Sequence, residues 1–435
     1  MENRETIEVE DLGGEMERPA QNYGPVKKKK NEFKKGFLSG VAASLAAVLI
    51  LGAVGSMVLT SNGYVFTTFK PDKNLTGGIL SESVETKLSE ILGALSAYYY
   101  DEVDQETAAE GLYAGLVDSL GDPYSRYFTK EDYRDYLNSS NGTYYGIGAV
   151  LTQNTQTGEI SISRVYEGSP ANEAGLKAGD VFVSADEFDA EGADLSEFVT
   201  HVKGDEGTTV KITVLRDGKE KTFTVERRKV EVPTVEHQML QGNTGYIEIL
   251  EFDAVTTDQF ETALEDLKKQ GMTSLIVDLR DNPGGMVTSV TEILDTILPK
   301  GLLVYTQDKD GNKKEYKSDK KELGLPLAVL VNENSASASE IFAGAVKDYE
   351  YGTIIGTTTF GKGIVQVLTP LSDGSAIKVT TAKYFTPNGN YIHGVGIDPD
   401  IELEFEYQGD EDEDYDIMKD NQVLKALEIL SGDDK

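Results

Sequence analysis

Apolar residues in the second half of the chain alternate between two periods. Short apolar runs, typical of buried strands, are followed by segments in which apolar residues recur every three or four positions, as on one face of a helix. Strands are predicted at Gly245–Leu250, Leu275–Leu279, Leu327–Val331 and Gly352–Gly356, and helices at Gln259–Lys268, Val287–Ile297 and Ser339–Lys347. Because apolar strands that alternate with helices form parallel sheets covered by those helices, this half is predicted to be an α/β domain.

Between Gly146 and Arg228 the pattern changes to short β segments separated by turns such as Asp217-Gly218. Four segments alternate between apolar and polar residues or run apolar, as strands do. They are Ile160–Val165, Val181–Ala185, Val210–Leu215 and Thr222–Val225. The pattern predicts a compact, mainly β domain ahead of the α/β domain.

Two amphipathic helices are predicted before this β domain. Apolar residues recur at helical spacing from Ser81 to about Tyr100, and a second helical stretch, Thr107–Leu120, ends at the helix-breaking Gly121-Asp122-Pro123. These helices are compatible with a small cap or with an arm for dimerisation, and the pattern leaves both open.

The segment Phe37–Leu59 has 23 residues without a charge, enough to cross a bilayer as a helix. Six lysines lie between positions 27 and 35, and such a cluster holds the N-terminus on the inner side. We expect an uncleaved anchor, with everything after residue 60 on the outer face of a cell membrane. The alternative is a cleaved signal peptide, but the 35-residue leader is long for one and lacks a clear cleavage site.

Composition excludes several classes of function. The net charge is −34, and all of it lies from Lys70 onward, so the outer part would repel nucleic acid. The absence of cysteine excludes disulfides, thiolate catalysis and cysteine-ligated metals. Three histidines, His201, His237 and His393, leave little room for a His-rich metal site. We expect no cofactor.

Candidate chemistry lies at the end of the predicted strand Leu327–Val331. The segment Asn334-Ser335-Ala336-Ser337-Ala338-Ser339-Glu340 follows that strand and opens a helix. A serine at such a turn has its hydroxyl lifted clear of the sheet, beside the free N–H groups of the first helical turn. That geometry suits a nucleophile whose product is an oxyanion. Ordinary helix capping by Ser335 or Ser337 is the alternative.

Two further motifs follow neighbouring predicted strands. Lys362 is flanked by two glycines in the otherwise uncharged stretch Thr359–Gln366, and burial beside Ser337 would leave it a neutral amine able to accept a proton. A lysine in a surface hairpin is the alternative. The segment Asp278–Gly285 ends in Pro-Gly-Gly and could supply a backbone N–H to an oxyanion, or be a simple loop. Three motifs at the ends of three strands suggest one site.

Together these motifs resemble the C-terminal processing peptidases, also called tail-specific peptidases. The resemblance runs from about residue 80 to 405 and is carried by Ser335–Glu340, Phe360–Gly363, Asn282–Gly285 and Thr386–Gly389. It implies that Ser337 is the nucleophile and Lys362 its base. A glutamine one helical turn later, which orients the lysine in that family, corresponds to Gln366. The resemblance also implies a crotonase/Clp-like core and an oxyanion hole from the Gly284 and Ala338 amides.

The β domain resembles a bacterial PDZ domain in the segment from Gly168 to Asp180. In such domains a loop, here Gly146, Ile147 and Gly148, captures a terminal carboxylate, and the peptide adds as a strand beside Ile147–Leu151. The facing helix would be Leu195–Val202. Lys203 stands where the family usually has Arg, so the planar two-pronged contact with a carboxylate is lost. A tight turn at Gly146–Gly148 is the structural alternative.

The expected function is therefore a membrane-anchored serine endopeptidase that cleaves polypeptides near their C-termini after PDZ recognition of the tail, with homodimerisation a possibility. A non-catalytic adaptor has no reason to keep Ser337, Lys362 and Gln366 together. A crotonase-like acyl-CoA enzyme would not explain the anchor or the PDZ-like domain. The predicted parts are a cytoplasmic disordered tail (1–35), a transmembrane anchor (36–60), a linker (61–78), an N-terminal helical region (79–140), the PDZ domain (143–230), the peptidase core (231–408) and an acidic tail with a short helix (409–435).

Overall fold

The computed structural model describes residues 73–319, 321–409 and 415–432. The chain divides into two units, Met1–Leu80 and Ser81–Lys435. Of the first unit only the helix α2, Lys73–Ile79, and the residue after it are described. The predicted cytoplasmic tail and anchor lie outside the described residues. Among the helices that are described, none is both long and apolar enough to span a membrane.

The α/β domain is built on a six-stranded sheet in the order β10-β11-β12-β15-β16-β19. All neighbouring pairs are parallel except β10 with β11, so the predicted mostly parallel sheet is confirmed. The strands are β10 (Val235–Leu240), β11 (Thr244–Ile249), β12 (Ser274–Asp278), β15 (Leu327–Val331), β16 (Thr353–Gly356) and β19 (Ile401–Glu402). The sequence motifs at the ends of β12, β15 and β16 thus follow three adjacent strands.

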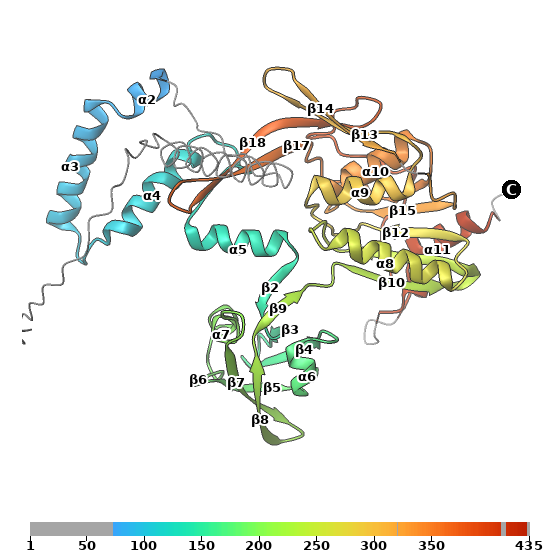
Figure 1. The fold of residues 1–435 in the computed structure, drawn as a ribbon, viewed down its shortest axis with the longest axis horizontal. Coiled ribbons are helices and arrows are strands. Elements are labelled where there is room, and N and C mark those ends of the chain that lie inside the picture. The colour runs from blue at the N-terminus through green and yellow to red at the C-terminus, as the bar shows by residue number, and fades with distance from the viewer. Residues whose placement is uncertain (1–72, 320, 410–414, 433–435) are drawn as a thin grey trace, which may run out of the picture. The chain divides into compact units, whose positions relative to one another are not determined.

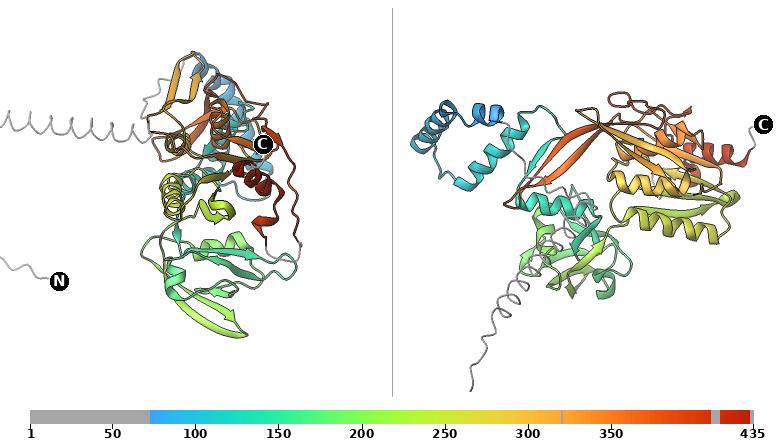
Figure 2. Two further views of the ribbon diagram at one scale, coloured as in Figure 1. Left: turned by 90° about the vertical axis from the view of Figure 1, so that its right-hand side faces the viewer. Right: turned by 45° about the horizontal axis from the view of Figure 1, so that its top comes forward.

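Both faces of this sheet are covered. Alternate strand residues such as Ile247, Val277 and Val329 pack with α8 (Thr256–Lys269), α9 (Val287–Ile297) and α10 (Ala338–Asp348) in the main hydrophobic core. The residues between them face α11 (Asn421–Ser431) in a second core. Figures 1 and 2 show α8 and α9 on one side of the strands and α11 on the other. Each fully buried aliphatic side chain contributes about 1.5–3 kcal/mol, so both layers are needed for stability.

A second, antiparallel sheet has the order β1-β18-β13-β14, with β17 also paired to β18. The sequence pattern did not predict it. Its strands are β1 (Arg126–Phe128), β13 (Gly301–Asp308), β14 (Lys313–Ser318), β17 (Ile364–Pro370) and β18 (Ala376–Phe385). β17 and β18 form the long hairpin of Figure 1. β1 comes from the N-terminal region, so this sheet joins that region to the α/β domain.

The β domain has a sheet in the order β3-β4-β5-β7-β8, with β6 paired to β5. Its elements are β3 (Ala149–Gln153), β4 (Ile160–Val165), α6 (Pro170–Ala174), β5 (Val181–Ala185), β6 (Phe188–Asp189), α7 (Leu195–Val202), β7 (Thr209–Arg216) and β8 (Lys219–Glu226). Its own core includes Phe182 and Phe198, whose rings meet edge to face. The chain enters and leaves through a two-stranded ribbon, β2 (Thr143–Gly146) with β9 (Arg228–Glu231). β3 is an edge strand of its sheet.

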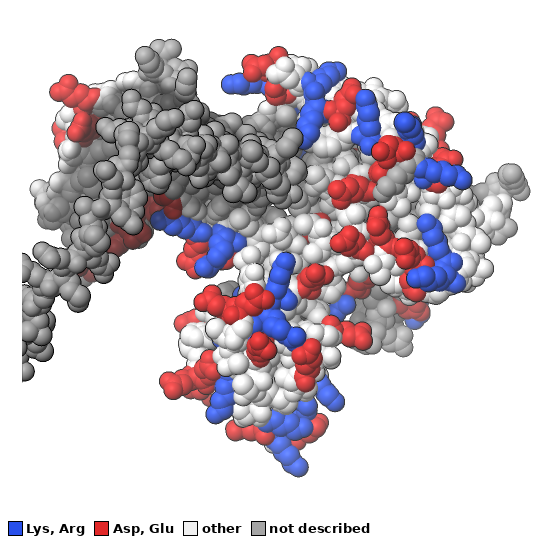
Figure 3. Space-filling view, viewed as in Figure 1, with Lys and Arg blue, Asp and Glu red and all other residues white. Residues whose placement is uncertain are grey.

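Besides α2, three helices of the described residues precede the β domain: α3 (Glu82–Tyr98), α4 (Gln105–Asp118) and α5 (Lys130–Ser140). The first two correspond to the predicted amphipathic helices. Neither has a buried residue, and large apolar side chains, among them Ile91, Leu92 and Leu95, are exposed. On the face seen in Figure 3, acidic and basic side chains are interspersed over the α/β and β domains.

Candidate active site

Ser337 lies at the turn between β15 and α10, directly before the helix begins. Its backbone has φ 55° and ψ −109°, a left-handed conformation that is uncommon outside glycine. Such strain costs about 1–3 kcal/mol and persists only where the surroundings hold it in place. A strained strand-to-helix turn is also how a serine nucleophile is presented at the end of a sheet. The half-buried Ser337 therefore has the backbone geometry expected of a nucleophile.

The loop after β12 lies against this turn. A Cβ atom built on Gly284 would be 2.7 Å from Ser337 Cβ and 2.8 Å from the Ala338 nitrogen, so only glycine fits there. The backbone carbonyl of Asn282 accepts hydrogen bonds from the Ala336 N–H and from the Ser339 hydroxyl, both at 3.0 Å. The Gly284 N–H itself donates to Asn282 Oδ1 at 2.8 Å. The two amides expected to form an oxyanion hole are thus neighbours, but that of Gly284 already has an acceptor.

A buried carboxylate, Glu340, joins the serine turn to the lysine turn. Its Oε2 accepts the Ser337 N–H at 2.9 Å and the Lys362 N–H at 2.8 Å. Its Oε1 accepts the Thr359 hydroxyl and the Gly361 N–H, each at 2.7 Å. Glu340 is fully buried, and hydrogen bonds to a charged acceptor are about twice as strong as neutral ones. The shared oxygen places the backbone nitrogens of Ser337 and Lys362 within about 6 Å of each other.

Tyr384 of β18 makes the same connection through carbonyl groups. Its hydroxyl donates to the Ser337 carbonyl at 3.0 Å and to the Lys362 carbonyl at 2.6 Å. Burial raises the pKa of Tyr384 well above its ordinary value, so the hydroxyl keeps its proton and remains a donor. Two side chains from different elements therefore hold the backbones of Ser337 and Lys362 together.

The Lys362 amine is half-buried and lies over the ring of Tyr124, with its Nζ 4.8 Å from the ring centroid. Burial lowers the pKa of Lys362, although the carboxylates of Glu340 and Asp122 act in the opposite direction. The shift favours the neutral amine that a general base requires. No hydrogen bond joins the Ser337 and Lys362 side chains in this structure, although their backbones are held close together.

Gln366 lies on β17, not on a helix, so its predicted position one helical turn after Lys362 is wrong. The segment Ile364–Pro370 pairs along β18, and Gln366 is directly opposite Thr380. Its amide donates to the Thr380 hydroxyl at 3.4 Å and to the Ile364 carbonyl at 3.5 Å. Both bonds are long, and neither involves Lys362.

The predicted carboxylate loop of the β domain, Gly146–Gly148, leads directly into the edge strand β3. Ile147 is buried, and Gly148 has φ 79°. A Cβ on Gly148 would lie 2.3 Å from Ser169 Cβ, which explains the glycine. The Lys203 amine lies 5.7 Å from the ring centroid of Tyr144, in the strand that leads into this loop. β3 pairs only with β4 and faces α7, so its outer side is unpaired within the sheet.

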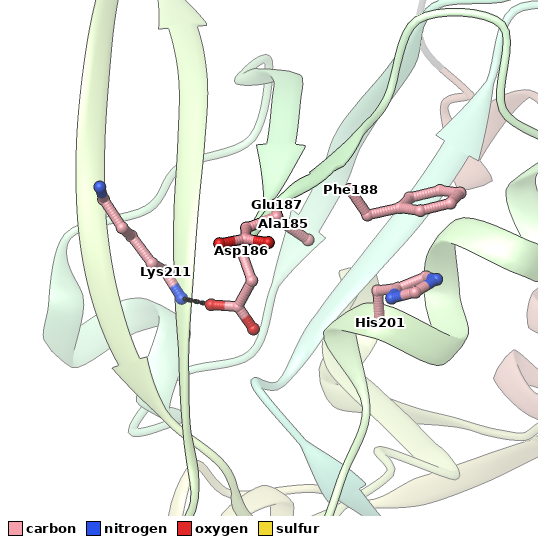
Figure 4. A pocket seen from close by; sticks show the side chains of 6 residues that line it. All are labelled: Ala185, Asp186, Glu187, Phe188, His201 and Lys211. Atoms are coloured by element: carbon pink, nitrogen blue, oxygen red, sulfur yellow. Dashed lines mark hydrogen bonds between the residues drawn. The ribbon is translucent and has the colours of Figure 1, made fainter.

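A hollow of about 700 Å³ lies elsewhere on the β domain and contains none of the candidate catalytic residues. Figure 4 shows the Lys211 backbone N–H donating to the Asp186 carboxylate while the Lys211 amine points away, and His201 stacked on Phe188. The two stacked rings have centroids 4.0 Å apart. His201 thus packs on the surface of α7, as a structural histidine does. The hollow is lined by opposite charges and is assigned no role in the reaction.

Glu340 lies within one of the sequence motifs but no role of its own was predicted for it, and Tyr384 was not among the predicted site residues. One signal was available for Glu340, because an acidic residue in the first turn of an apolar helix is typical of N-terminal capping. No local pattern marks Tyr384, which reaches the site from 47 residues beyond Ser337.

Comparisons with known proteins identify the family. Peptidase family S41 matches residues 243–403, a PDZ domain matches 145–226, and the domain described as the activating protease CtpB N-terminal domain matches 67–132. A probable CtpA-like serine protease of Staphylococcus epidermidis is 34% identical over 355 residues, which cover 80% of this chain and 72% of that protein. One of Staphylococcus aureus is 34% identical over 358 residues, covering 81% and 71%.

Among solved structures, the photosystem II D1 C-terminal processing protease matches 74% of this chain and 85% of its own, with 29% identity and a TM-score of 0.43. On the sequence matches, the chain belongs to peptidase family S41, among the C-terminal processing serine proteases that carry a PDZ domain. The α/β domain is accordingly the peptidase core and the β domain the PDZ domain.

Proposed function

We propose that Ser337 and Lys362 form the catalytic dyad of this serine peptidase, with Ser337 as nucleophile and Lys362 as general base. The observation that carries the proposal is the position of Glu340, which binds both backbone nitrogens through one oxygen. The shared oxygen keeps the two backbone nitrogens within about 6 Å of each other, and the flexible four-carbon side chain of a lysine can span such a distance. The lowered pKa of Lys362 supports the same role.

The proposed reaction is acyl transfer. The neutral Lys362 amine takes the proton of the Ser337 hydroxyl as the oxygen attacks a peptide carbonyl. The tetrahedral oxyanion is stabilised by the Ala338 and Gly284 amides, and the protonated Lys362 gives its proton to the leaving amine. A water molecule that gives a proton to Lys362 then attacks the acyl carbonyl, and the protonated Lys362 returns that proton to the Ser337 oxygen as the acid leaves.

Two local changes separate the described geometry from this reaction. The Lys362 side chain has to turn from Tyr124 to the Ser337 hydroxyl, and the Gly284 N–H has to be released from Asn282. Once Lys362 has turned to Ser337, Gln366 is proposed to orient the lysine from β17. Neither change moves the backbones that Glu340 and Tyr384 hold together.

Ser337→Ala and Lys362→Ala test this assignment. The full-length proteins, solubilised in mild detergent, are incubated with an unfolded protein, and the fragments are identified by mass spectrometry. Each variant is expected to lose roughly 10⁴-fold or more in kcat while retaining its circular dichroism spectrum. Substantial cleavage by Ser337→Ala would end the proposal.

We further propose that the PDZ domain selects substrates by their C-terminal tails. A peptide tail would add to the unpaired side of β3, with its carboxylate at Gly146–Gly148 and the Lys203 charge nearby. Peptides that end in a free acid should bind the Ser337→Ala protein more tightly than their C-terminal amides. Equal affinity for the two forms would refute tail recognition.

The membrane placement and the homodimer are also proposals. The segment 36–60 would anchor the chain with its N-terminus inside and the peptidase core on the outer face, which protease accessibility in intact cells would check. The exposed apolar residues of α3 fit a second copy of the chain. Ile91→Asp should then lower the oligomeric state measured by light scattering, and an unchanged mass would exclude α3 as the interface.

A further inference from the structure

Two cations face each other across the second sheet, close to the candidate dyad. Arg126 of β1 is directly opposite Lys378 of β18, and Lys378 is directly opposite Leu368 of β17. Directly opposed residues of antiparallel strands project from the same face, and like charges at such positions destabilise a sheet. The pair therefore carries an electrostatic cost that the fold itself does not explain.

Aromatic rings hold both cations in place. The Arg126 guanidinium lies 5.1 Å, and the Lys378 amine 5.6 Å, from the centroid of the same Phe128 ring. The Lys378 amine is also 4.8 Å from the ring centroid of Tyr136, on α5. Arg126 is exposed and Lys378 half-buried, so their charged ends are fixed on a surface that remains accessible.

Neither cation forms an ion pair within the described parts of the chain. Burial lowers the pKa of Lys378, and Lys362 and Arg126 lower it further, whereas no carboxylate raises it. The chain as a whole carries 75 Asp and Glu against 41 Lys and Arg. In so acidic a protein, two opposed cations that have no carboxylate partner indicate a binding site for an external anion.

Arg126 and Lys378 lie close to the candidate catalytic residues Lys362 and Gln366. Thr380 is two positions beyond Lys378 on β18, so it shares the same face, and it is directly opposite Gln366. Lys362 is also close enough to act on the charge of Lys378. In the proposed reaction Lys362 protonates the leaving amine, so the departing part of the substrate lies on the side of this lysine.

We propose that Arg126 and Lys378 bind a carboxylate of the peptide fragment that leaves in the first step. This inference rests on the proposed dyad. A carboxylate between the two cations would offset their repulsion and form charge-assisted hydrogen bonds, which are the strong ones. The enzyme would then favour substrates that carry an acidic group, a side chain or the chain terminus, shortly after the cleaved bond.

Matched peptides test the inference. The first pair differs only in Glu or Gln in the leaving fragment, and both peptides end in an amide so that tail docking is the same. The second pair differs only in a terminal acid or amide. Each pair is cleaved by the wild-type protein, by Arg126→Met and by Lys378→Met, and kcat/KM is compared within the pair. Methionine keeps an apolar stem against the rings while removing the charge.

The wild-type protein should favour the carboxylate about tenfold or more. Both variants should reduce the preference in the first pair to less than about threefold and should reduce that in the second pair only by the part that PDZ docking does not supply. The control is Lys383→Met, on the same strand, whose amine lies over Tyr391. This control should keep the wild-type preference. Loss of the preference in either pair supports the inference and identifies the source of the carboxylate.

A wild-type protein that cleaves both members of each pair equally well would overturn the inference while leaving the proposed dyad intact. So would preferences that are as large in Arg126→Met and Lys378→Met as in the wild-type protein. A wild-type protein that cleaves none of the peptides, nor an unfolded protein, would instead contradict the proposed function. Inorganic phosphate provides a further check: inhibition confined to the carboxylate-bearing peptides supports the site, and equal inhibition of both members overturns it.

Discussion

Replacing Glu340 with glutamine exchanges one oxygen of the carboxylate that joins the serine and lysine turns for an NH₂ group. The carboxylate accepts four hydrogen bonds, two on each oxygen, and three of the donors are backbone N–H groups while the fourth is the Thr359 hydroxyl. A glutamine amide offers an oxygen to only one pair. If that oxygen serves the Ser337 and Lys362 amides, the NH₂ group meets the Thr359 hydroxyl, which can turn to accept, and the Gly361 N–H, which cannot.

The magnitude follows from these contacts. An unsatisfied buried donor costs about 1–3 kcal/mol, and the three remaining bonds weaken because the acceptor is no longer charged. We therefore expect Glu340→Gln to lower the free energy of unfolding by about 3–5 kcal/mol. In the folded fraction, a displacement of about 1 Å between Ser337 and Lys362 should reduce kcat roughly 100-fold.

The assay measures both effects on the same full-length protein. Urea unfolding is followed by circular dichroism, and turnover is normalised to the fraction of Ser337 that reacts with a fluorophosphonate probe. The matched control is Glu265→Gln on α8, an exposed carboxylate paired only with Lys269 at 3.7 Å, which should change stability by less than about 0.5 kcal/mol. A Glu340→Gln protein as stable and as active as the control would refute the reasoning.

Three other substitutions have directions that follow from the structure. Asp122 raises the pKa of Lys362, so Asp122→Asn should lower that pKa and move the acidic limb of the kcat/KM profile to lower pH; an upward shift would contradict the assignment of the base. Asp420 is buried, pairs with Arg280 at 2.8 Å and caps α11. Because Arg280 keeps its second partner, Asp278, Asp420→Ala removes one of two ion pairs and the helix cap, and should cost about 1–3 kcal/mol in urea unfolding. Gly284→Ala should abolish cleavage, because its Cβ has no room and φ is 104°; activity close to that of the wild type would show that this loop moves freely.

The elements that bury an apolar face could be predicted from the sequence. β15 and α9 have the predicted bounds, Leu327–Val331 and Val287–Ile297, because every strand residue is buried and the helix has a continuous apolar stripe. The motifs at the ends of predicted strands also indicated where the candidate site lies, because neighbouring parallel strands end at the same edge of a sheet.

The remaining features depend on contacts between distant parts of the chain. β17 and β18 are partly exposed on both faces, so they lack the clean alternation that would reveal a strand. The expected helical spacing of Gln366 failed because pairing with β18 determines the conformation of that segment. The bridging roles of Glu340 and Tyr384 join residues 22 and 47 positions apart, and no local pattern encodes such contacts.

The packing of α11 affects how the protein is made. Until this helix has been made, the face of the sheet that carries Ile276, Ala328 and Leu330 lacks the helix that covers it and is exposed to solvent. A nascent chain that already contains Ser337 and Lys362 therefore lacks part of the core packing until α11 has been made. Closure of this face of the sheet therefore depends on a helix that follows every strand of the sheet in the sequence.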